Sequence, residues 1–509
     1  MLWITWFAAN ITMWMNDVAS AWLMTSIAPS PLWVALVQTA ATLPVFLLGL
    51  PSGALADTLD RRRYFMATQI WVAVVATVLC AVIVLDALTP PLLLVLTFAN
   101  GIGLALRWPV FAAIIPEVIS YRQLPQALAL NSISMNASRI IGPLVAGALI
   151  AGVGAEWVFV LNAVLSILAT LSIWRWRRVH KESPLGREPV TDAMRVGLQY
   201  VAQSGRLRAL LLRIALFFLH STALMALLPL VARSLPGGKA GTFTVLLAAM
   251  GAGAILAALL MPRIRSWLPL QRRVFVGTAL QGISAVAVAY APNLWVAVPA
   301  MAIGGMTWIT VANSLTVAAQ MGLPDWVRAR GMAIYQMALM GSTAAGAALW
   351  GQIATWTSIR TSLALSAVIG IVLMALAQRF YRVDRGTEEE LTPSPGVMKM
   401  PDMPAPAKSG RIQLMIEYRI DPKRAGEFEA LMQESRRSRL RQGVLDWQLL
   451  HDVAEPSRYV EQITDASWTE HLRRFDRISA ADVQLRDRRL AFQVGETPPV
   501  VRRYVVEQE

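Results

Sequence analysis

The chain has 509 residues, of which 56% are hydrophobic and only 15% are charged, and its formal net charge at pH 7 is +14. Soluble domains carry charge on about a quarter of their residues, so this composition excludes a protein that faces water along its whole length. The basic excess lies in residues 1–385, with 27 Lys and Arg against 11 Asp and Glu, whereas residues 386–509 have 19 against 21. Because the excess belongs to the apolar part, it indicates membrane topology and argues against nucleic-acid binding.

Apolar stretches of about twenty residues, the length that crosses a bilayer, recur from the start of the chain to residue 381. The first stretch lacks a preceding basic segment, so we predict a membrane helix there and no cleavable signal. In chain order we predict about twelve spans, near residues 2–26, 32–55, 64–86, 91–115, 126–152, 156–175, 208–233, 240–262, 272–291, 293–320, 331–355 and 360–381.

The basic residues between these spans fall on alternate loops. One set of loops carries most of them, namely Arg61–Arg63, Arg122, Arg175, Arg177, Arg178, Lys181, Arg187, Arg263, Arg265, Arg272, Arg273, Arg328, Arg330, Arg379, Arg382 and Arg385. The opposite set holds little beyond Arg233, Lys239 and Arg360. Loops rich in Lys and Arg face the cytoplasm, so the pattern predicts that both termini are cytoplasmic.

A polar segment, residues 176–207, divides six predicted spans from six. The spacing of Val196, Tyr200 and Val201 predicts an amphipathic helix in this linker, lying on the cytoplasmic surface of the membrane.

The two sets of spans also resemble each other. A shift of 199 residues superposes Leu124-Pro125 on Leu323-Pro324, Trp157 on Trp356, and Gly142, Gly147 and Gly152 on Gly341, Gly346 and Gly351. Parallel repeats of six spans are a known plan of transporters. The sequence therefore predicts an all-α membrane part of two six-helix bundles, residues 1–175 and 208–385.

The composition changes after Asp384. Residues 386–409 are polar and rich in Pro, which predicts a cytoplasmic linker. Residues 410–509 show the element order β-α-β-β-α-β, which predicts a ferredoxin-like α+β domain. This segment resembles the small dimeric α/β-barrel domains of the antibiotic-biosynthesis monooxygenase type, which leaves regulation or a homodimer through this domain as its expected roles.

Three residues of the C-terminal domain, Trp447, His451 and His471, invite a catalytic interpretation. No metal-ligand spacing, nucleophile arrangement or cofactor loop accompanies them, and the single cysteine, Cys80, lies within an apolar stretch. We therefore expect no enzymatic activity, no cofactor and no metal.

The stretch PSGALADTLDRRRYF, residues 51–65, covers the end of the second predicted span and the residues after it. Its Gly53, Asp57, Arg61 and Arg62 resemble the signature loop of the major facilitator superfamily, although Thr58 stands where a basic residue is usual and Asp60 where Gly is usual. The resemblance implies a cytoplasmic latch between the two halves, in which Asp57 caps a helix end and pairs with an arginine. The alternative is that Arg61–Arg63 only anchor the topology.

The fifth predicted span contains SRIIGPLVAGALIAG. Its Gly142, Pro143 and Gly147 resemble a signature common among proton-coupled antiporters of the same superfamily, with Ala148 in place of the final Gly. The resemblance implies export by exchange, while the residues themselves require only close helix packing and a bend at the proline.

Charged residues inside membrane spans are costly, and they point to function. Asp17 lies midway along the first span, and a buried carboxylate favours its protonated form, so Asp17 is our candidate for proton coupling. His220 in the seventh span is a second candidate. Arg107 and Arg139 are candidate charge partners of Asp17 or contacts for an anionic substrate.

The chain as a whole resembles the transmembrane secretion effector branch of the major facilitator superfamily, related to bacterial enterobactin exporters. AWLMTS, ALVQTAATLPVFLL, GALADTLDRRR and SWTEHLRR carry the resemblance. It implies a secondary transporter of the bacterial inner membrane that exports a small amphipathic, siderophore-like or drug-like molecule against inward proton flow by alternating access. There are two alternatives. One is an importer or facilitator of the same fold, and the other is a non-transporting receptor or scaffold that signals through the C-terminal domain.

Overall fold

The computed structural model describes residues 2–28, 30–118, 124–174, 190–381, 410–495 and 497–507. They form two compact units, which we describe separately. The first unit comprises Met1–Lys181, Ala209–Ala318 and Ala333–Arg382, and the second comprises Glu182–Arg208, Ala319–Met332 and Val383–Glu509. Both predicted six-helix segments thus contribute to one unit, and the region of the central linker joins the C-terminal domain in the other.

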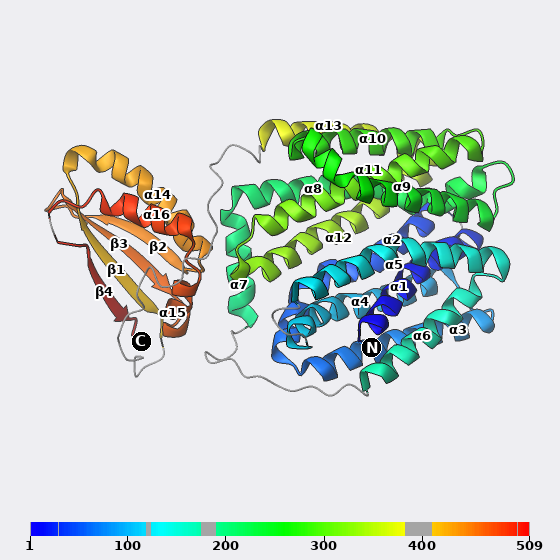
Figure 1. Ribbon diagram of the computed structural model, residues 1–509, viewed down its shortest axis with the longest axis horizontal. Helices are drawn as coiled ribbons and strands as arrows, with labels where there is room; N and C mark the ends of the chain where they lie inside the picture. The colour runs from blue at the N-terminus through cyan, green and yellow to red at the C-terminus, as the bar shows by residue number, and fades with distance from the viewer. Residues whose placement is uncertain are drawn as a thin grey trace. The chain divides into compact units, whose positions relative to one another are not determined.

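Six long helices make up the N-terminal half of the membrane part (Figure 1): α1 (Leu2–Ile27), α2 (Pro31–Thr58), α3 (Arg61–Val84), α4 (Pro90–Val118), α5 (Leu124–Gly152) and α6 (Glu156–Trp174). Their packing pairs α1 with α5, α2 with α4, and α3 with α6. The turn between α2 and α3 is stabilised by Asp60, whose side chain accepts a hydrogen bond of 2.9 Å from the backbone N–H of Arg63 and so caps α3.

Six further long helices make up the C-terminal half: α8 (Gly205–Ser234), α9 (Ala240–Trp267), α10 (Leu270–Ala289), α11 (Leu294–Met321), α12 (Asp325–Trp356) and α13 (Ile359–Phe380). The helices α10 and α13 pack against each other. In the interior of the first unit, both halves contribute to one apolar core that includes Met15, Phe159, Leu227 and Trp350. The indole N–H of Trp350 donates to the Leu219 carbonyl at 2.7 Å, so this large buried side chain leaves no polar atom without a partner.

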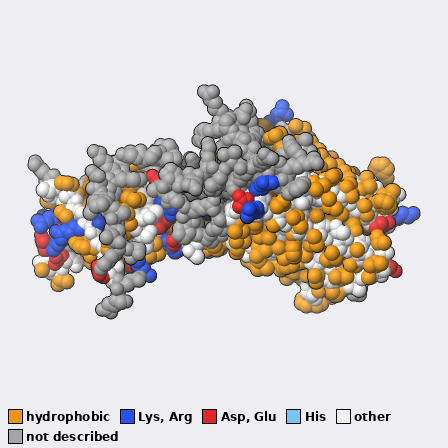
Figure 2. All heavy atoms as spheres, turned by 90° about the horizontal axis from the view of Figure 1, so that it is seen from below, with side chains coloured by type: hydrophobic (Ala, Val, Ile, Leu, Met, Phe, Trp, Pro, Cys, Tyr) orange, Lys and Arg blue, Asp and Glu red, His pale blue; other side chains and the backbone are white. Residues whose placement is uncertain are grey.

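Within the described residues, seven helical segments are long and apolar enough to cross a membrane: Pro31–Ser52, Arg62–Val84, Pro90–Arg107, Gly205–Ser234, Ala240–Trp267, Leu294–Met321 and Ile359–Phe380. The face of the first unit seen in Figure 2 is covered mostly by hydrophobic side chains, as expected for a surface in contact with lipid. A mainly helical membrane part is therefore confirmed, whereas the number of twelve spans stays a prediction.

The C-terminal domain contains a four-stranded antiparallel sheet in the order β2-β3-β1-β4. Its elements are β1 (Ile412–Arg419), a short 3-10 helix (Pro422–Arg424), α14 (Ala425–Arg441), β2 (Asp446–His451), β3 (Arg458–Asp465), α15 (Trp468–Asp476), α16 (Ala480–Leu490) and β4 (Val500–Val505). Alternate residues of β1 are buried, and Leu414 and Ile416 pack with Phe428 and Met432 of α14. The period of two thus directs one face of the sheet toward the helices.

The central linker forms α7 (Val190–Gln203), which belongs to the same unit as the C-terminal domain. A helix predicted from Val196, Tyr200 and Val201 is therefore present, and all three side chains are buried.

Candidate functional site

The two halves of the first unit meet through small residues of α5 and α9. Gly142 lies against α1, where an added Cβ would be 2.6 Å from Cβ of Trp14, and Gly147 lies against α9, where an added Cβ would be 2.6 Å from both Cγ2 and Oγ1 of Thr244. The predicted antiporter-like motif therefore contacts its own half on one side and the opposite half on the other. Small residues allow this close approach of the helix backbones.

A second interface joins α2 with α12. The hydroxyl of Thr39 donates to the Ala344 carbonyl at 2.9 Å, and the backbone N–H of Leu32 donates to the Thr355 hydroxyl at 3.1 Å. Gly341 on α12 faces the ring of Phe46, where an added Cβ would lie 2.6 Å from Cδ2. At both interfaces a glycine allows the close approach, Gly147 toward Thr244 and Gly341 toward Phe46.

Arg233 joins the halves at the end of α8. Its guanidinium donates to the Thr25 carbonyl at 2.9 Å and lies 5.0 Å from the centroid of the Trp22 ring, which in turn stacks on Phe243 at 5.4 Å. The sequence placed Arg233 among the few basic residues of the opposite loops but gave no sign of these contacts, because the partners are more than 200 residues away.

Asp17, the candidate proton carrier, is half-buried on α1. Among the described residues it has no hydrogen bond or ion pair. The adjacent Asn16 is buried and accepts a hydrogen bond of 3.3 Å from the amide of Asn162 on α6, whose carbonyl oxygen accepts one of 3.3 Å from the Ser166 hydroxyl. Sequence reasoning missed Asn162 and Ser166, although polar residues inside an apolar helix were a usable signal.

Arg107 does not form an ion pair with Asp17. Its guanidinium is buried, donates to the Ala9 carbonyl at 3.2 Å, and lies 5.4 Å from the centroid of the Trp6 ring, which stacks on Phe111. Ala9 and Asp17 are eight residues apart on α1, about 12 Å along the helix axis. In this conformation Arg107 therefore binds the backbone of α1 well away from the carboxylate.

His220 is buried on α8 and packs against α13, where an added Cβ on Gly370 would collide with its ring. The ring also lies edge-on to Phe217 at 5.5 Å, and among the described residues its Nε2 has no hydrogen-bond partner. The side chain of Arg139 is not among those described. The structure thus places Asp17, Arg107 and His220 separately and does not join any two of them.

The latch residues lie where α2 ends and α3 begins. Gly53 and Asp57 belong to the last turns of α2, and Arg61 and Arg62 begin α3. Arg62 is half-buried, whereas the side chains of Asp57 and Arg61 fall outside the described set. Asp60, one of the two departures from the family signature, has a defined role because it caps α3.

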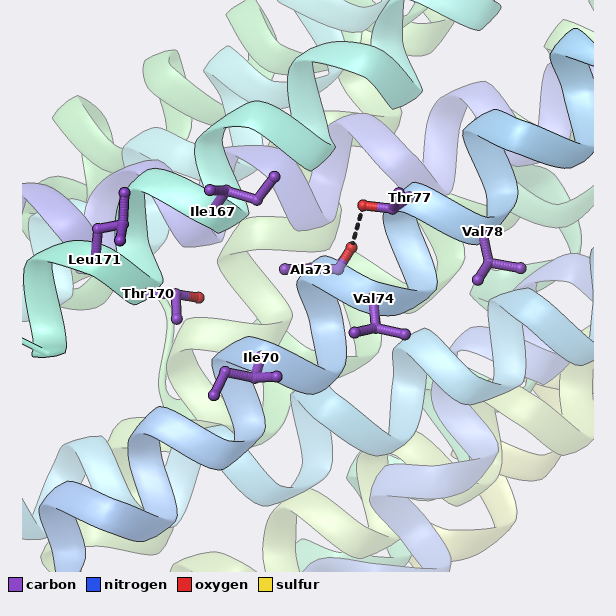
Figure 3. A pocket seen from close by; sticks show the side chains of 8 residues that line it. All are labelled: Ile70, Ala73, Val74, Thr77, Val78, Ile167, Thr170 and Leu171. Carbon is purple, nitrogen blue, oxygen red and sulfur yellow. Dashed lines mark hydrogen bonds between the residues drawn. The ribbon is translucent and has the colours of Figure 1, made fainter.

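A groove of about 350 Å³ lies between α3 and α6 (Figure 3). Its lining is apolar apart from two threonines whose hydroxyls donate to their own helices, Thr77 to Ala73 at 2.8 Å and Thr170 to Ser166 at 2.9 Å. Both helices belong to the N-terminal half, so this groove does not lie between the halves, where a substrate path is expected. The full lining is Ile70, Ala73, Val74, Thr77, Val78, Ile167, Thr170 and Leu171.

The C-terminal domain buries a charged cluster around Glu461, a residue with no exposed surface. Its carboxylate accepts hydrogen bonds from the indole of Trp447 at 2.9 Å and the hydroxyl of Tyr418 at 3.1 Å, and forms ion pairs with Arg439 and Arg489 at 3.3 and 3.2 Å. Burial acts to raise the pKa of Glu461, but the two arginines outweigh it and lower the pKa to about 2.

His471 lies in a second buried cluster. Its Nδ1–H donates to Asp465 at 2.7 Å, and its Nε2 accepts from Arg503 at 3.2 Å. Burial lowers the pKa of His471 despite the carboxylate beside it, so the imidazole is neutral. Both of its ring nitrogens form hydrogen bonds. The exposed His451 stacks on Tyr459 at 4.2 Å. The two histidines thus have packing or hydrogen-bonding partners, and no group of three or more potential metal ligands occurs in the part of the chain that is described.

Comparison with known proteins gives consistent matches. A family model for the transmembrane secretion effector matches residues 1–509. The staphyloferrin A transporter of Staphylococcus aureus (strain NCTC 8325 / PS 47) is 23% identical over 281 residues, 54% of this chain and 70% of that protein. Macrolide efflux protein A of Streptococcus pyogenes is 22% identical over 292 residues, 56% of this chain and 70% of that protein.

The fold is also found in solved structures. A bacterial homolog of the human lysosomal transporter Spinster, in an inward-facing and unoccupied conformation, superposes with a TM-score of 0.57 at 16% identity, covering 75% of this chain and 94% of the other. At this identity the likeness shows the fold alone. The superposition leaves a quarter of this chain outside.

Proposed function

Since the chain belongs to the transmembrane secretion effector family of the major facilitator superfamily, a family of transporters and not of enzymes, we propose that it is a proton-coupled exporter. Its substrate is a small amphipathic molecule of the siderophore or drug class. Two relatives, a staphyloferrin A transporter and a macrolide efflux protein, support this class. The broader role, a multi-pass membrane transporter of small molecules, follows from the family itself.

The observation that carries the proposal is the combination of a small-residue interface with a carboxylate that has no partner among the described residues. Gly147 and Thr244 bring α5 and α9 of opposite halves into close contact. Asp17 is half-buried on α1 with no described partner to hold its charge. A group of this kind binds and releases a proton as its access changes, while the interface opens and closes.

The finer architecture is part of the same proposal. The six helices of each half form twelve membrane spans, with both termini in the cytoplasm of a bacterial cell and the protein in its inner membrane. The basic loops support this orientation. Asp57 and Arg61 contribute to a cytoplasmic latch. Their positions at the end of α2 and the start of α3 support this role. Arg107 holds α1 and is freed to pair with Asp17 or an anionic substrate in another state.

For the C-terminal domain we propose a ferredoxin-like fold with a role in regulation or in a homodimer. The element order and the strand order β2-β3-β1-β4, antiparallel throughout, support this topology. A facilitator or importer of the same fold remains the second candidate for the membrane part, since the geometry described is compatible with either direction.

Accumulation of compounds in inside-out vesicles under an imposed pH gradient tests the proposal. Siderophores, dyes and antibiotics would be compared in wild type, in Asp17→Asn, and in Glu156→Gln, a matched control at an exposed acidic residue at the start of α6. We expect gradient-driven accumulation of at least one compound in wild type and the control, and its loss in correctly folded Asp17→Asn. Accumulation in Asp17→Asn equal to that of the wild type would show that another residue carries the coupling to protons.

A further inference from the structure

The linker helix α7 makes backbone-directed contacts with the C-terminal domain, at the turn between α14 and β2. The guanidinium of Arg195 donates to the Gly443 carbonyl at 3.0 Å, and the side-chain amide of Gln199 donates to the Val444 carbonyl at 3.3 Å. Arg195 also donates to Gln199 at 3.1 Å and lies 3.6 Å from Asp192, so the two donors are held in position. Contacts to carbonyl groups depend on the shape of the turn rather than on its side chains.

The turn itself is shaped to receive α7. Gly443 has a φ of +102°, a conformation that L residues rarely adopt. An added Cβ at this position would also lie 2.7 Å from Cγ2 of Val196, whose side chain is fully buried. Glycine is therefore required at Gly443 both by its backbone conformation and by the approach of α7.

The same unit includes the start of α12, which completes the contact. The guanidinium of Arg477 donates to the Gln442 carbonyl at 2.8 Å, pairs with Glu470 at 2.8 Å, and lies 5.2 Å from the centroid of the Trp326 ring. Trp326 in turn meets the ring of Tyr200 edge-on at 5.8 Å. A buried arginine of the C-terminal domain, an aromatic residue of α12 and one of α7 therefore meet at one point.

Helix α7 also touches α12 directly. An added Cβ on Gly197 would lie 3.0 Å from Cβ of Arg330. The C-terminal domain, α7 and the start of α12 thus contact one another pairwise, although they are far apart in the sequence. A long linker, residues 386–409, precedes the C-terminal domain, so the covalent connection alone does not require this arrangement.

We propose that α7 and residues 325–330 form a docking surface for the C-terminal domain of the same chain. The domain holds α7, which lies in the connection between the halves, against the start of α12 in the C-terminal half. The apolar face of α7, which the sequence assigns to the membrane surface, is then occupied by protein. The C-terminal domain thereby restrains α7, and with it the connection between the two halves.

The test uses the full-length protein with a specific protease site placed in residues 386–409. After cleavage in detergent, a docked C-terminal domain remains with the membrane part during size-exclusion chromatography. We expect retention in the wild type and release in Arg195→Ala/Gln199→Ala, with the dissociation constant raised about tenfold or more, as for loss of a charged hydrogen bond. Arg437→Ala, at an exposed arginine of α14, is the matched control and is expected to behave as the wild type.

Hydrogen exchange of the uncleaved proteins provides the second readout and separates loss of docking from loss of folding. In the double variant we expect faster exchange in residues 190–203 with unchanged protection of β1 and β3. Release of the wild-type domain at the same protein concentration, or equal retention and equal exchange in the double variant, would overturn the proposal. Trp326→Ala, which changes the start of α12, is also expected to weaken retention of the cleaved C-terminal domain.

Discussion

The contact between Gly147 of α5 and Thr244 of α9 can be tested by adding one methyl group. The Cβ of Gly147→Ala would lie 2.6 Å from Cγ2 and Oγ1 of Thr244, whereas ordinary contacts begin at 3.4 Å, so the helices must separate by about 0.8 Å. Overpacking of this kind costs about 1 to 3 kcal/mol. In a transporter that alternates between two states, this cost shifts the population about 5- to 150-fold away from the state in which the helices touch.

Spin labels at Ala148 and Val245, two exposed positions beside the contact, report this population in a Cys80→Ala background. We expect Gly147→Ala to reduce the fraction of molecules in which the two spin labels are close together. Gly152→Ala is the matched control on the same helix, since no described atom lies within 4 Å of an added Cβ there, and it is expected to leave the distances unchanged.

A second substitution, Thr244→Gly, removes the three atoms that the new methyl group meets, namely Cγ2, Oγ1 and Cβ of Thr244. We expect Gly147→Ala/Thr244→Gly to recover the short distance. A wild-type distance distribution in Gly147→Ala, or no recovery of that distribution when the threonine side chain is removed, would refute a close contact between α5 and α9.

The C-terminal domain provides two further predictions. Glu461→Gln leaves two buried arginines without their counter-charge and should lower the free energy of unfolding of the domain by about 3 to 5 kcal/mol. The control Glu434→Gln, at an exposed ion pair, should lower it by less than about 1 kcal/mol. Chemical denaturation of both variants measures the difference, and equal stabilities would contradict the buried network. The lowered pKa of His471 means that the unfolded state binds its proton more readily, so the domain should lose stability as the pH falls below about 6.5. Unfolding midpoints measured against pH in wild type and His471→Gln check this, and an identical pH dependence of the two between pH 6.5 and 5 would exclude His471 as the cause.

Hydrophobic length was sufficient to predict a mainly helical membrane part, and the change in composition was sufficient to predict a small C-terminal domain with a sheet. Runs such as Pro31–Ser52 are apolar for long enough to cross a bilayer, and the alternation along β1 directs one face inward. These features depend on neighbouring residues in the chain, which the sequence shows directly.

The contacts of the candidate site depend instead on residues far apart in the chain. Asn16 and Asn162 are 146 residues apart, and the hydrogen bond between them requires the packing of α1 against α6. Likewise Arg195 and Gly443 are 248 residues apart. The pattern of α7 indicated an apolar face but not its partner, because a membrane surface and a protein surface favour the same residues.

The internal pH of proteoliposomes during substrate movement tests proton-coupled export most directly. A compound identified in the vesicle screen is loaded inside, and its outward flow is started by dilution. We predict that the interior becomes acidic as protons enter in exchange for the compound, and that Asp17→Asn abolishes this acidification. Movement of the compound through the wild-type protein without any change in internal pH would contradict proton coupling and identify a facilitator.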